Sequence, residues 1–291
     1  MSIDNLQDKI RKRKNPSVID FSILPEDLPS HLLEEEGSFL KAYGRFCTEL
    51  LNALKDTVPA VRFSMSAFAF WGADGLKLLE TVLDTAKTMG YYVFMDIPGA
   101  LSAREAAMGA QLLYDQGRFC FDAAVMSCYI GSDSLRPYIA GLKETGKDLF
   151  AVVRTANKTA PELQDLLTGS RLVHMAAADI VNRFSEDYVS KCGYSRVGIM
   201  AGASSADSLK NLRTKYPRMF LLLDGYDYPN ANAKNCSFAF DRFGHGAIAC
   251  AGTSVTAAWK EAEEVNKGYV ECALDAAERM KKNLTRYVTV L

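Results

Sequence analysis

Charged and hydroxyl side chains in this sequence stand where short apolar runs end, a position from which they could act on a ligand. The clearest example is Tyr92–Asp96, a run too short for a helix, which ends in a carboxylate before a Pro-Gly turn and the helix-forming segment Ala103–Tyr114. This order predicts a strand that delivers Asp96 to the mouth of a β/α unit. Asp96 could then serve chemistry or simply cap the turn before the next helix.

Eight such runs occur, each followed by a turn and a segment of helical periodicity. The predicted strands are Ser17–Phe21, Ala60–Ser66, Tyr92–Asp96, Asp122–Ser127, Leu149–Thr155, Arg196–Ala201, Met219–Asp224 and Gly246–Ala251. The predicted helices are Gly37–Asp56, Ala73–Met89, Ala103–Tyr114, Ser134–Glu144, His174–Lys191, Ser205–Lys215, Ala233–Asp241 and Thr256–Thr285. Apolar strands without polar alternation are buried on both faces, as in a parallel sheet. The pattern predicts an α/β fold, a TIM (β/α)8 barrel. A doubly wound sheet is the alternative, but no Gly-x-Gly-x-x-Gly motif follows the first strand.

In a barrel, functional residues lie at the carboxyl ends of the strands, and this rule selects a short set of candidates. The set is Asp20, Arg62, Ser64, Asp96, Ser127, Arg154, Thr155, Asn157, Gly202, Asp224, Gly225, Cys250, Gly252 and Thr253. Its arginines and hydroxyl groups favour an anionic ligand. The turn that contains Gly252 and Thr253 could also hold an anion on backbone amides.

Each candidate has a purely structural alternative. Arg62 and Arg154 could grip an anion, or they could pair with Asp96 and Asp20 in a buried network. The segment Thr155–Asn157 could contact a ligand or form an ordinary turn, and the same choice holds for the turn after the last strand.

Composition excludes several classes of function. With 291 residues, 48% of them hydrophobic, the chain can bury a large core, and a net charge of −1 argues against a nucleic-acid or membrane-surface protein. A small-molecule ligand is expected instead. Seven cysteines without Cys-x-x-Cys pairs predict reduced thiols and a cytoplasmic protein, with Cys128 and Cys250 in the core. The three histidines stand too far apart to suggest a metal site.

The sequence predicts a single domain over residues 1–291, with residues 1–16 as an N-terminal helical extension. No linker rich in Pro, Gly or Ser divides the chain, and no apolar run reaches the roughly 18 residues of a membrane span. The basic run Asp8–Lys14 lacks the apolar stretch of a secretory signal. It could be a solvated amphipathic helix or contact a phosphate or a partner.

Several motifs, in order and spacing, resemble one family along nearly the whole chain. They are Lys12–Asp20 with Leu24–Leu28, Ala60–Phe63 with Trp71–Leu76, Asp122–Val125 with Tyr129–Pro137, Val153–Asn157, Val197–Ala203 with Leu212–Arg213, and Gly244–Ile248. Together they are similar to the longer bacterial subgroup of the orotidine 5′-phosphate decarboxylases. The resemblance implies a homodimeric TIM barrel that removes CO2 from orotidine monophosphate in UMP synthesis, without metal or organic cofactor.

The resemblance also implies an array of two lysines and two aspartates, in which a lysine protonates the ring carbon and one aspartate comes from the other subunit. The family's motif is Asp-x-Lys-x-x-Asp at the end of the third strand. Here the lysine position carries Pro98 and the second aspartate position carries Leu101, although Asp96 is matched. Arg62 stands where the lysine of the second strand is expected, and arginine is not an effective proton donor near neutral pH.

Two further places depart from the family pattern. Phe21 falls where the first strand should end in a pocket aspartate, and strand alternation predicts that Asp20 lies on the opposite face. The loop Asp224–Asn230 matches one glycine, Gly225, of the family's phosphate loop, and Thr253 replaces its arginine. Losing that charge-assisted contact, worth roughly 1.5 to 3 kcal/mol, and adding Asp224 and Asp227 should weaken binding of a phosphate monoester.

Three hypotheses follow for function. The chain could be a decarboxylase-family protein with lost or much reduced activity. It could be a pseudoenzyme that binds a ligand or a partner, or an enzyme of changed chemistry that uses Asp96 and Arg62 on another anionic substrate. The expected partners are an anionic small molecule or nucleotide and a second copy of the chain.

Overall fold

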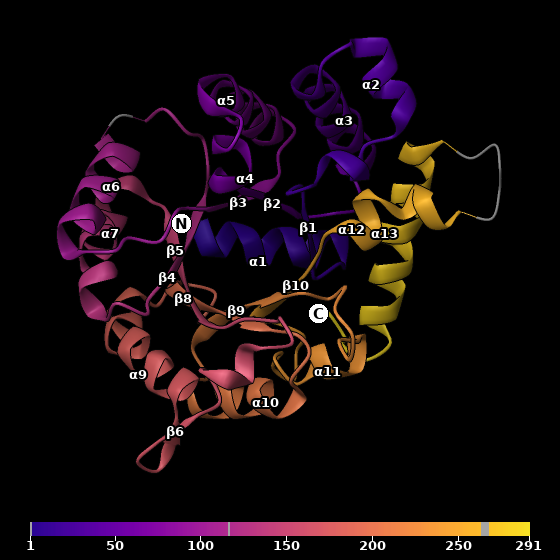
Figure 1. The fold of residues 1–291 in the computed structure, drawn as a ribbon. Helices are drawn as coiled ribbons and strands as arrows, with labels where there is room; N and C mark the ends of the chain where they lie inside the picture. Colours follow the sequence, from indigo (N-terminus) through magenta and orange to yellow (C-terminus); the bar gives the residue numbers. More distant parts are fainter. Residues whose placement is uncertain (1, 116, 263–267) are drawn as a thin grey trace.

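In the computed structural model, which describes residues 2–115, 117–262 and 268–291, eight parallel strands close into a barrel (Figure 1). Around the barrel the strands follow the order β1, β10, β9, β8, β5, β4, β3, β2. They are β1 (Ser17–Asp20), β2 (Ala60–Ser64), β3 (Tyr92–Asp96), β4 (Ala123–Ser127), β5 (Asp148–Arg154), β8 (Ser195–Gly202), β9 (Met219–Asp224) and β10 (Ala247–Ala251). The predicted TIM barrel is confirmed.

Helices form the outer layer and join successive strands (Figure 1). They are α2 (Ser30–Glu36), α3 (Phe39–Leu54), α4 (Met65–Ala69), α5 (Gly72–Thr88), α6 (Ala103–Asp115), α7 (Arg136–Ala140), α8 (Leu142–Thr145), α9 (Val173–Ser185), α10 (Ala206–Lys215), α11 (Ala233–Ser237), α12 (Thr253–Thr256) and α13 (Tyr269–Thr285). A small antiparallel hairpin of β6 (Leu167–Thr168) and β7 (Arg171–Leu172) projects between β5 and α9. None of the described helices is long and apolar enough to cross a membrane.

Some predicted boundaries were wrong where short helices replace regular elements. The strand predicted over Ala60–Ser66 ends at Ser64, because α4 begins at Met65. The helix predicted over Ser134–Glu144 is divided into α7 and α8 at Gly141. The helix predicted over His174–Lys191 ends at Ser185, whose carbonyl accepts a hydrogen bond from the Ser195 hydroxyl at 2.6 Å.

The long helix predicted over Thr256–Thr285 was also wrong as one element. Helix α12 ends at Thr256, the residue where the predicted helix starts. A 3-10 turn follows over Ala258–Glu261, and α13 begins only at Tyr269. Residues 263–267 of that prediction lie outside the described residues. The sequence did not reveal α2, α4 or the β6–β7 hairpin.

The core has two layers that follow from strand alternation. On β1, for example, Val18 belongs to the cluster inside the barrel, whereas Ile19 belongs to the cluster between the barrel and its helices. Inside the barrel, the ring of Phe150 lies edge-on to those of Phe94 and Phe220, with centroids 5.3 and 6.1 Å apart. Side chains therefore fill the barrel, so that a ligand could reach only its ends.

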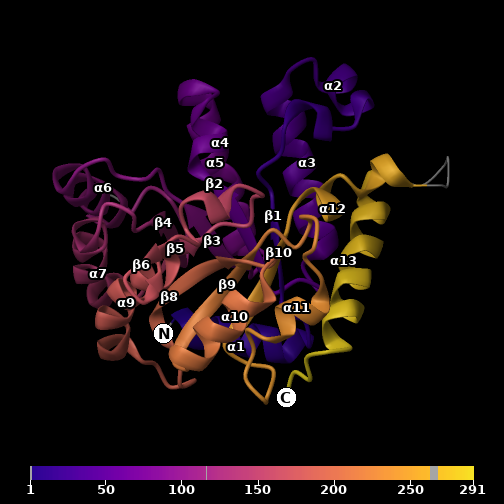
Figure 2. The ribbon, with the colours of Figure 1, turned by 60° about the horizontal axis from the view of Figure 1, so that its bottom comes forward.

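Helix α1 (Ser2–Arg13) closes the end of the barrel where the strands begin, here called the bottom (Figure 2). Ile3, Leu6 and Ile10 are fully buried and join the cluster inside the barrel. Gln7 accepts a hydrogen bond from the amide of Gly246 at 3.2 Å. Helix α1 is thus amphipathic, with an apolar face buried in the barrel and an opposite face, which includes Asp8, Arg11 and Lys12, exposed to solvent.

Helix α1 is expected to contribute much of the stability of the bottom. Leu6→Ala should lower the free energy of unfolding by about 3 kcal/mol, because a fully buried side chain leaves a cavity. Urea unfolding followed by circular dichroism measures the change. The control is Lys12→Ala, an exposed position on the same helix, which should stay within about 0.5 kcal/mol of the wild type. Equal effects of the two substitutions would contradict a sealing role for α1.

Candidate functional site

At the opposite end of the barrel, called the mouth, Arg62 holds together the ends of three strands. Its guanidinium donates to both carboxylate oxygens of Asp96 at 2.5 to 3.0 Å and to Asp224 at 2.5 Å, and it lies 3.5 Å from Asp20. These carboxylates come from the ends of β3, β9 and β1, so that the barrel closure brings residues far apart in sequence around one cation. The predicted pairing of Arg62 with Asp96 and Asp20 is present, and Asp224 adds a third carboxylate.

The orientation predicted for Asp20 was wrong. Val18 points into the barrel, and the period of two places Asp20 on the same face, toward Arg62. Phe21 instead is fully buried in the outer layer, where its ring stacks on Phe63 with centroids 5.2 Å apart. Asp20 therefore belongs to the mouth.

Burial and the surplus of carboxylates shape the electrostatics of this cluster. Burial raises the pKa of Asp20 to about 6, with a further contribution from Asp96 and an opposing one from Arg62. Burial likewise raises the pKa of Asp96. For Arg62, burial would lower the pKa, but Asp96, Asp20 and Asp224 outweigh it and hold the pKa well above its usual value. Arg62 consequently stays charged and cannot release a proton, and with all three carboxylates ionised the four groups carry an excess of negative charge.

The turn after β3, residues 97–102, adds no group acidic enough to act as a general acid near neutral pH. Pro98 lines a mostly apolar groove of about 460 Å³ beside α6, and Leu101 is 85% exposed to solvent. Within the described residues, the hydrogen bonds to the carboxylate of Asp96 come from Arg62 alone. Asp96 is therefore held as an ion-pair partner.

The turn after β10, a predicted anion cradle, already holds a carboxylate of the chain itself. Asp227 accepts hydrogen bonds from the amide of Gly252 at 2.6 Å, from the amide of Ser254 at 3.4 Å and from the Ser254 hydroxyl. Thr253 is exposed and lines a cavity of about 700 Å³ beside this turn. An external anion would have to displace Asp227 from these amides.

Gly225 fixes the loop that carries Asp227. Its φ of +71° is left-handed, and a Cβ at this position would stand 2.4 Å from the Cβ of Ala156. The close packing of the loops after β5 and β9 is therefore enough to explain a glycine at position 225, which the sequence had suggested as a ligand residue.

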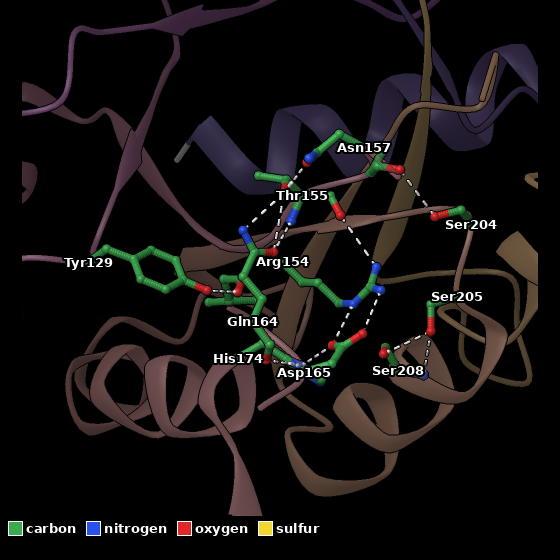
Figure 3. Close-up of polar contacts among 12 residues, drawn as sticks. Tyr129, Arg154, Thr155, Asn157, Gln164, Asp165, His174, Ser204, Ser205 and Ser208 are labelled. Carbon is green, nitrogen blue, oxygen red and sulfur yellow. Dashed lines mark hydrogen bonds and ion pairs between the residues drawn. The ribbon is translucent and has the colours of Figure 1, made fainter. Parts of the chain in front are cut away.

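The third group of predicted residues, after β5, is engaged in a network within one loop (Figure 3). Arg154 donates to both carboxylate oxygens of Asp165 at 2.9 and 3.0 Å, and the buried His174 places Nδ1 3.0 Å from the same carboxylate. Arg154 therefore pairs with Asp165 and anchors the loop, whereas the sequence had suggested Asp96 or Asp20 as its partner.

Thr155 and Asn157 form hydrogen bonds with each other and with neighbouring residues of that loop. The Thr155 amide donates to Gln164 at 2.7 Å, the Thr155 hydroxyl donates to Asn157 at 2.5 Å, and the Asn157 amide donates to Thr159 at 2.7 Å (Figure 3). These contacts describe an ordinary turn. Sequence reasoning missed Gln164, Asp165 and His174, because their partners lie 9 to 11 residues away and no periodic pattern connects them.

The two cysteines near the mouth are buried. Burial raises the pKa of Cys128 to about 12 and that of Cys250 well above its usual value, although Arg62 opposes the shift at Cys250. Thiolate is the reactive form, so neither residue is suited to nucleophilic chemistry. All seven cysteines lie in the described residues, and none of them forms a disulfide.

Comparison with known proteins identifies relatives over nearly the full chain, although no protein-family model matches it. The orotidine 5′-phosphate decarboxylases of Clostridium novyi (strain NT) and Clostridium perfringens (strain 13) are 26% and 27% identical over 288 residues, with 98% of both chains covered. The chain is a homologue of the orotidine 5′-phosphate decarboxylases. The solved structure of the Leishmania donovani OMP decarboxylase shares the fold with a TM-score of 0.76, at 20% identity and over 99% of both chains.

In this decarboxylase homologue, the pKa of Asp20 predicts a pH-dependent stability. Asp20 binds its proton more tightly in the folded state, with a pKa of about 6, than in the unfolded chain, where the value is near 3.8. Its stabilising contribution is complete below about pH 4 and is lost as the pH rises through about 6, with a total on the order of 3 kcal/mol. Asp20→Asn should remove this part of the pH dependence.

Urea unfolding of both proteins from pH 4.5 to 7.5 tests the expectation. Asp133→Asn is the control, because the side chain of Asp133 is 67% exposed, and this variant should keep the wild-type pH profile. Parallel profiles for the wild type and Asp20→Asn would show that Asp20 titrates normally in the fold.

Proposed function

We propose that this decarboxylase homologue has lost, or retains only a trace of, the ability to decarboxylate orotidine monophosphate, and that it now acts by binding a ligand or a partner. The observation that carries the proposal is the saturation of Arg62 by three carboxylates beside a turn without a general acid. Loss of CO2 leaves a carbanion, which needs a positioned acid to protonate it. Neither Arg62 nor the residues at positions 98 and 101 can fill this role.

The other end of the substrate would also be bound poorly. Asp227 occupies the amides of Gly252 and Ser254, and the carboxylates around Arg62 outnumber the guanidinium. A phosphate monoester would meet repulsion at both places, and even screened by solvent this repulsion opposes binding. We therefore expect any affinity for an anionic nucleotide to be weak.

The alternative of a changed enzyme acting on another anionic substrate is less well supported. Such an enzyme would use Arg62 to grip the substrate, yet the nitrogens of Arg62 already contact Asp20, Asp96 and Asp224. If an activity were found, Asp96→Asn and Arg62→Ala should each abolish it.

Activity and binding measurements test the proposal directly. With the Clostridium novyi enzyme as the positive control, CO2 release from orotidine monophosphate should be at least about 10³-fold slower, because the general acid is missing. Calorimetry should detect weak binding of UMP or none. The chain should also fail to restore growth of a uracil auxotroph. Robust growth together with CO2 release would refute the loss of activity.

We also infer that the protein is a homodimer in the cytoplasm. Large apolar side chains stand exposed on the loops after β2, β3 and β5, with Phe70 at 88%, Leu101 at 85% and Leu167 at 74% exposure. Exposed apolar surface of this kind favours a protein interface. Seven cysteines without a disulfide fit a reducing compartment.

Light scattering measures the oligomeric state. The expected mass is twice the chain mass of 32.0 kDa, and Leu101→Asp should shift the protein toward the monomer. Leu101 is 85% exposed, so the substitution should leave the fold intact. Tyr287→Asp, at a position 55% exposed after α13, is the control and should keep the dimer mass. A wild-type mass of one chain would contradict the inference.

A further inference from the structure

A cavity of about 400 Å³ lies near the bottom of the barrel, at the opposite end from the mouth. The cavity is lined by Asn5 on α1 and Lys87 at the end of α5. The turn before β4 contributes Asp122, and the turn before β5 contributes Lys147. The residues that form it are mostly polar. None of them belongs to the candidate site at the mouth.

Lys147 is a half-buried ammonium group that Asp122 attracts from a distance, but no carboxylate of the described residues lies within ion-pair contact of it. Its Nζ donates to the carbonyl of Phe121 at 2.6 Å and lies 3.9 Å from the centroid of the Phe121 ring. No ion pair joins Lys147 to any residue that the structure describes. A carbonyl and a ring face orient the ammonium but do not neutralise it.

Two more lysines surround the same region. Lys87 donates to both oxygens of Asp122 at 2.7 Å, and Asp122 also accepts the amide of Val93 at 2.8 Å. The Nζ of Lys9 donates to the carbonyl of Gly90 at 2.6 Å and, like Lys147, has no ion-pair partner among the described residues. Asp122 is therefore already committed to Lys87.

The charges do not balance. Among the residues that line the cavity, Lys87 and Lys147 carry two positive charges and Asp122 carries one negative charge, which leaves an excess of one positive charge. Burial lowers the pKa of both Lys147 and Lys9, Lys87 lowers both further, and Asp122 opposes the shift at each. Half-buried cations of like sign are stabilised when an anion joins them.

We propose that this cavity binds a small phosphate species, either free phosphate or the phosphate group of a compact monoester, between Lys87 and Lys147. Phosphate supplies the missing negative charge and accepts several charge-assisted hydrogen bonds at once. The amide of Asn5 faces the same space and offers a further donor. The site is independent of the proposed loss of activity at the mouth.

Isothermal titration with inorganic phosphate, at constant ionic strength set with sodium chloride, tests the site. The protein should bind phosphate saturably. Lys147→Met should raise the dissociation constant about tenfold or more, because a charged contact is lost. Lys147→Arg should retain most of the affinity because it keeps the charge. Lys12→Met, an exposed lysine on α1, is the control and should bind like the wild type. A parallel titration with glycerol phosphate distinguishes free phosphate from a monoester as the preferred species.

A spectroscopic readout covers the case in which Lys147→Met does not fold. In the wild type and in Lys147→Arg, the amide resonances of residues 121, 122 and 147 should shift with phosphate and not with chloride. Binding that is unchanged in Lys147→Met, or resonances that respond equally to chloride, would overturn the proposal. So would the absence of any saturable phosphate binding.

Discussion

The mouth of this barrel depends on one buried cation. Arg62 projects from the end of β2 into a space where water is scarce, and a guanidinium there must be paired to be tolerated. Three aspartates from β1, β3 and β9 provide that pairing. Two of these strands, β1 and β3, pair with β2, whereas β9 lies farther around the barrel. The cluster therefore fixes the positions of the four strand ends relative to one another. The same contacts occupy the guanidinium N–H groups of Arg62 that could otherwise donate hydrogen bonds to a ligand.

Much of this arrangement could be predicted from the sequence, since parallel strands buried on both faces leave a clear apolar signature. The ends of β3 and β9 were predicted at Asp96 and Asp224, and the strand-end rule then gathered Arg62 with both. Asp20 was misplaced because the direction of its side chain was inferred from Phe21 in an aligned family position. Counting from Val18, which must face the interior, gives the observed direction.

The contacts between loops could not be predicted in the same way. Arg154 meets Asp165 only because the loop after β5 folds back on itself, and a sequence does not specify the path of an irregular loop. Asp227 was recognised as a charge unfavourable to phosphate. Its carboxylate reaches the amides of Gly252 and Ser254 because the loop turns through a left-handed conformation at Gly225. A glycine in the sequence permits this conformation but does not require it.

The composition of the chain conceals how unevenly its charge is distributed. Thirty-four basic and 35 acidic residues nearly cancel, and the net charge alone predicts little attraction to any ion. In the fold, carboxylates exceed cations at the mouth, while ammonium groups exceed carboxylates at the cavity near the bottom. An average over the chain therefore says nothing about which end would attract an anion.

The position of α1 has a consequence for synthesis of the chain. Helix α1 packs on residues as late as Gly246, and β1 pairs with β10, so that the partners of this early segment are complete only when β10 has left the ribosome. At typical rates of translation, this interval is on the order of tens of seconds. Throughout that time the apolar face of α1 has no barrel to cover, and a nascent-chain chaperone is the natural protection for it.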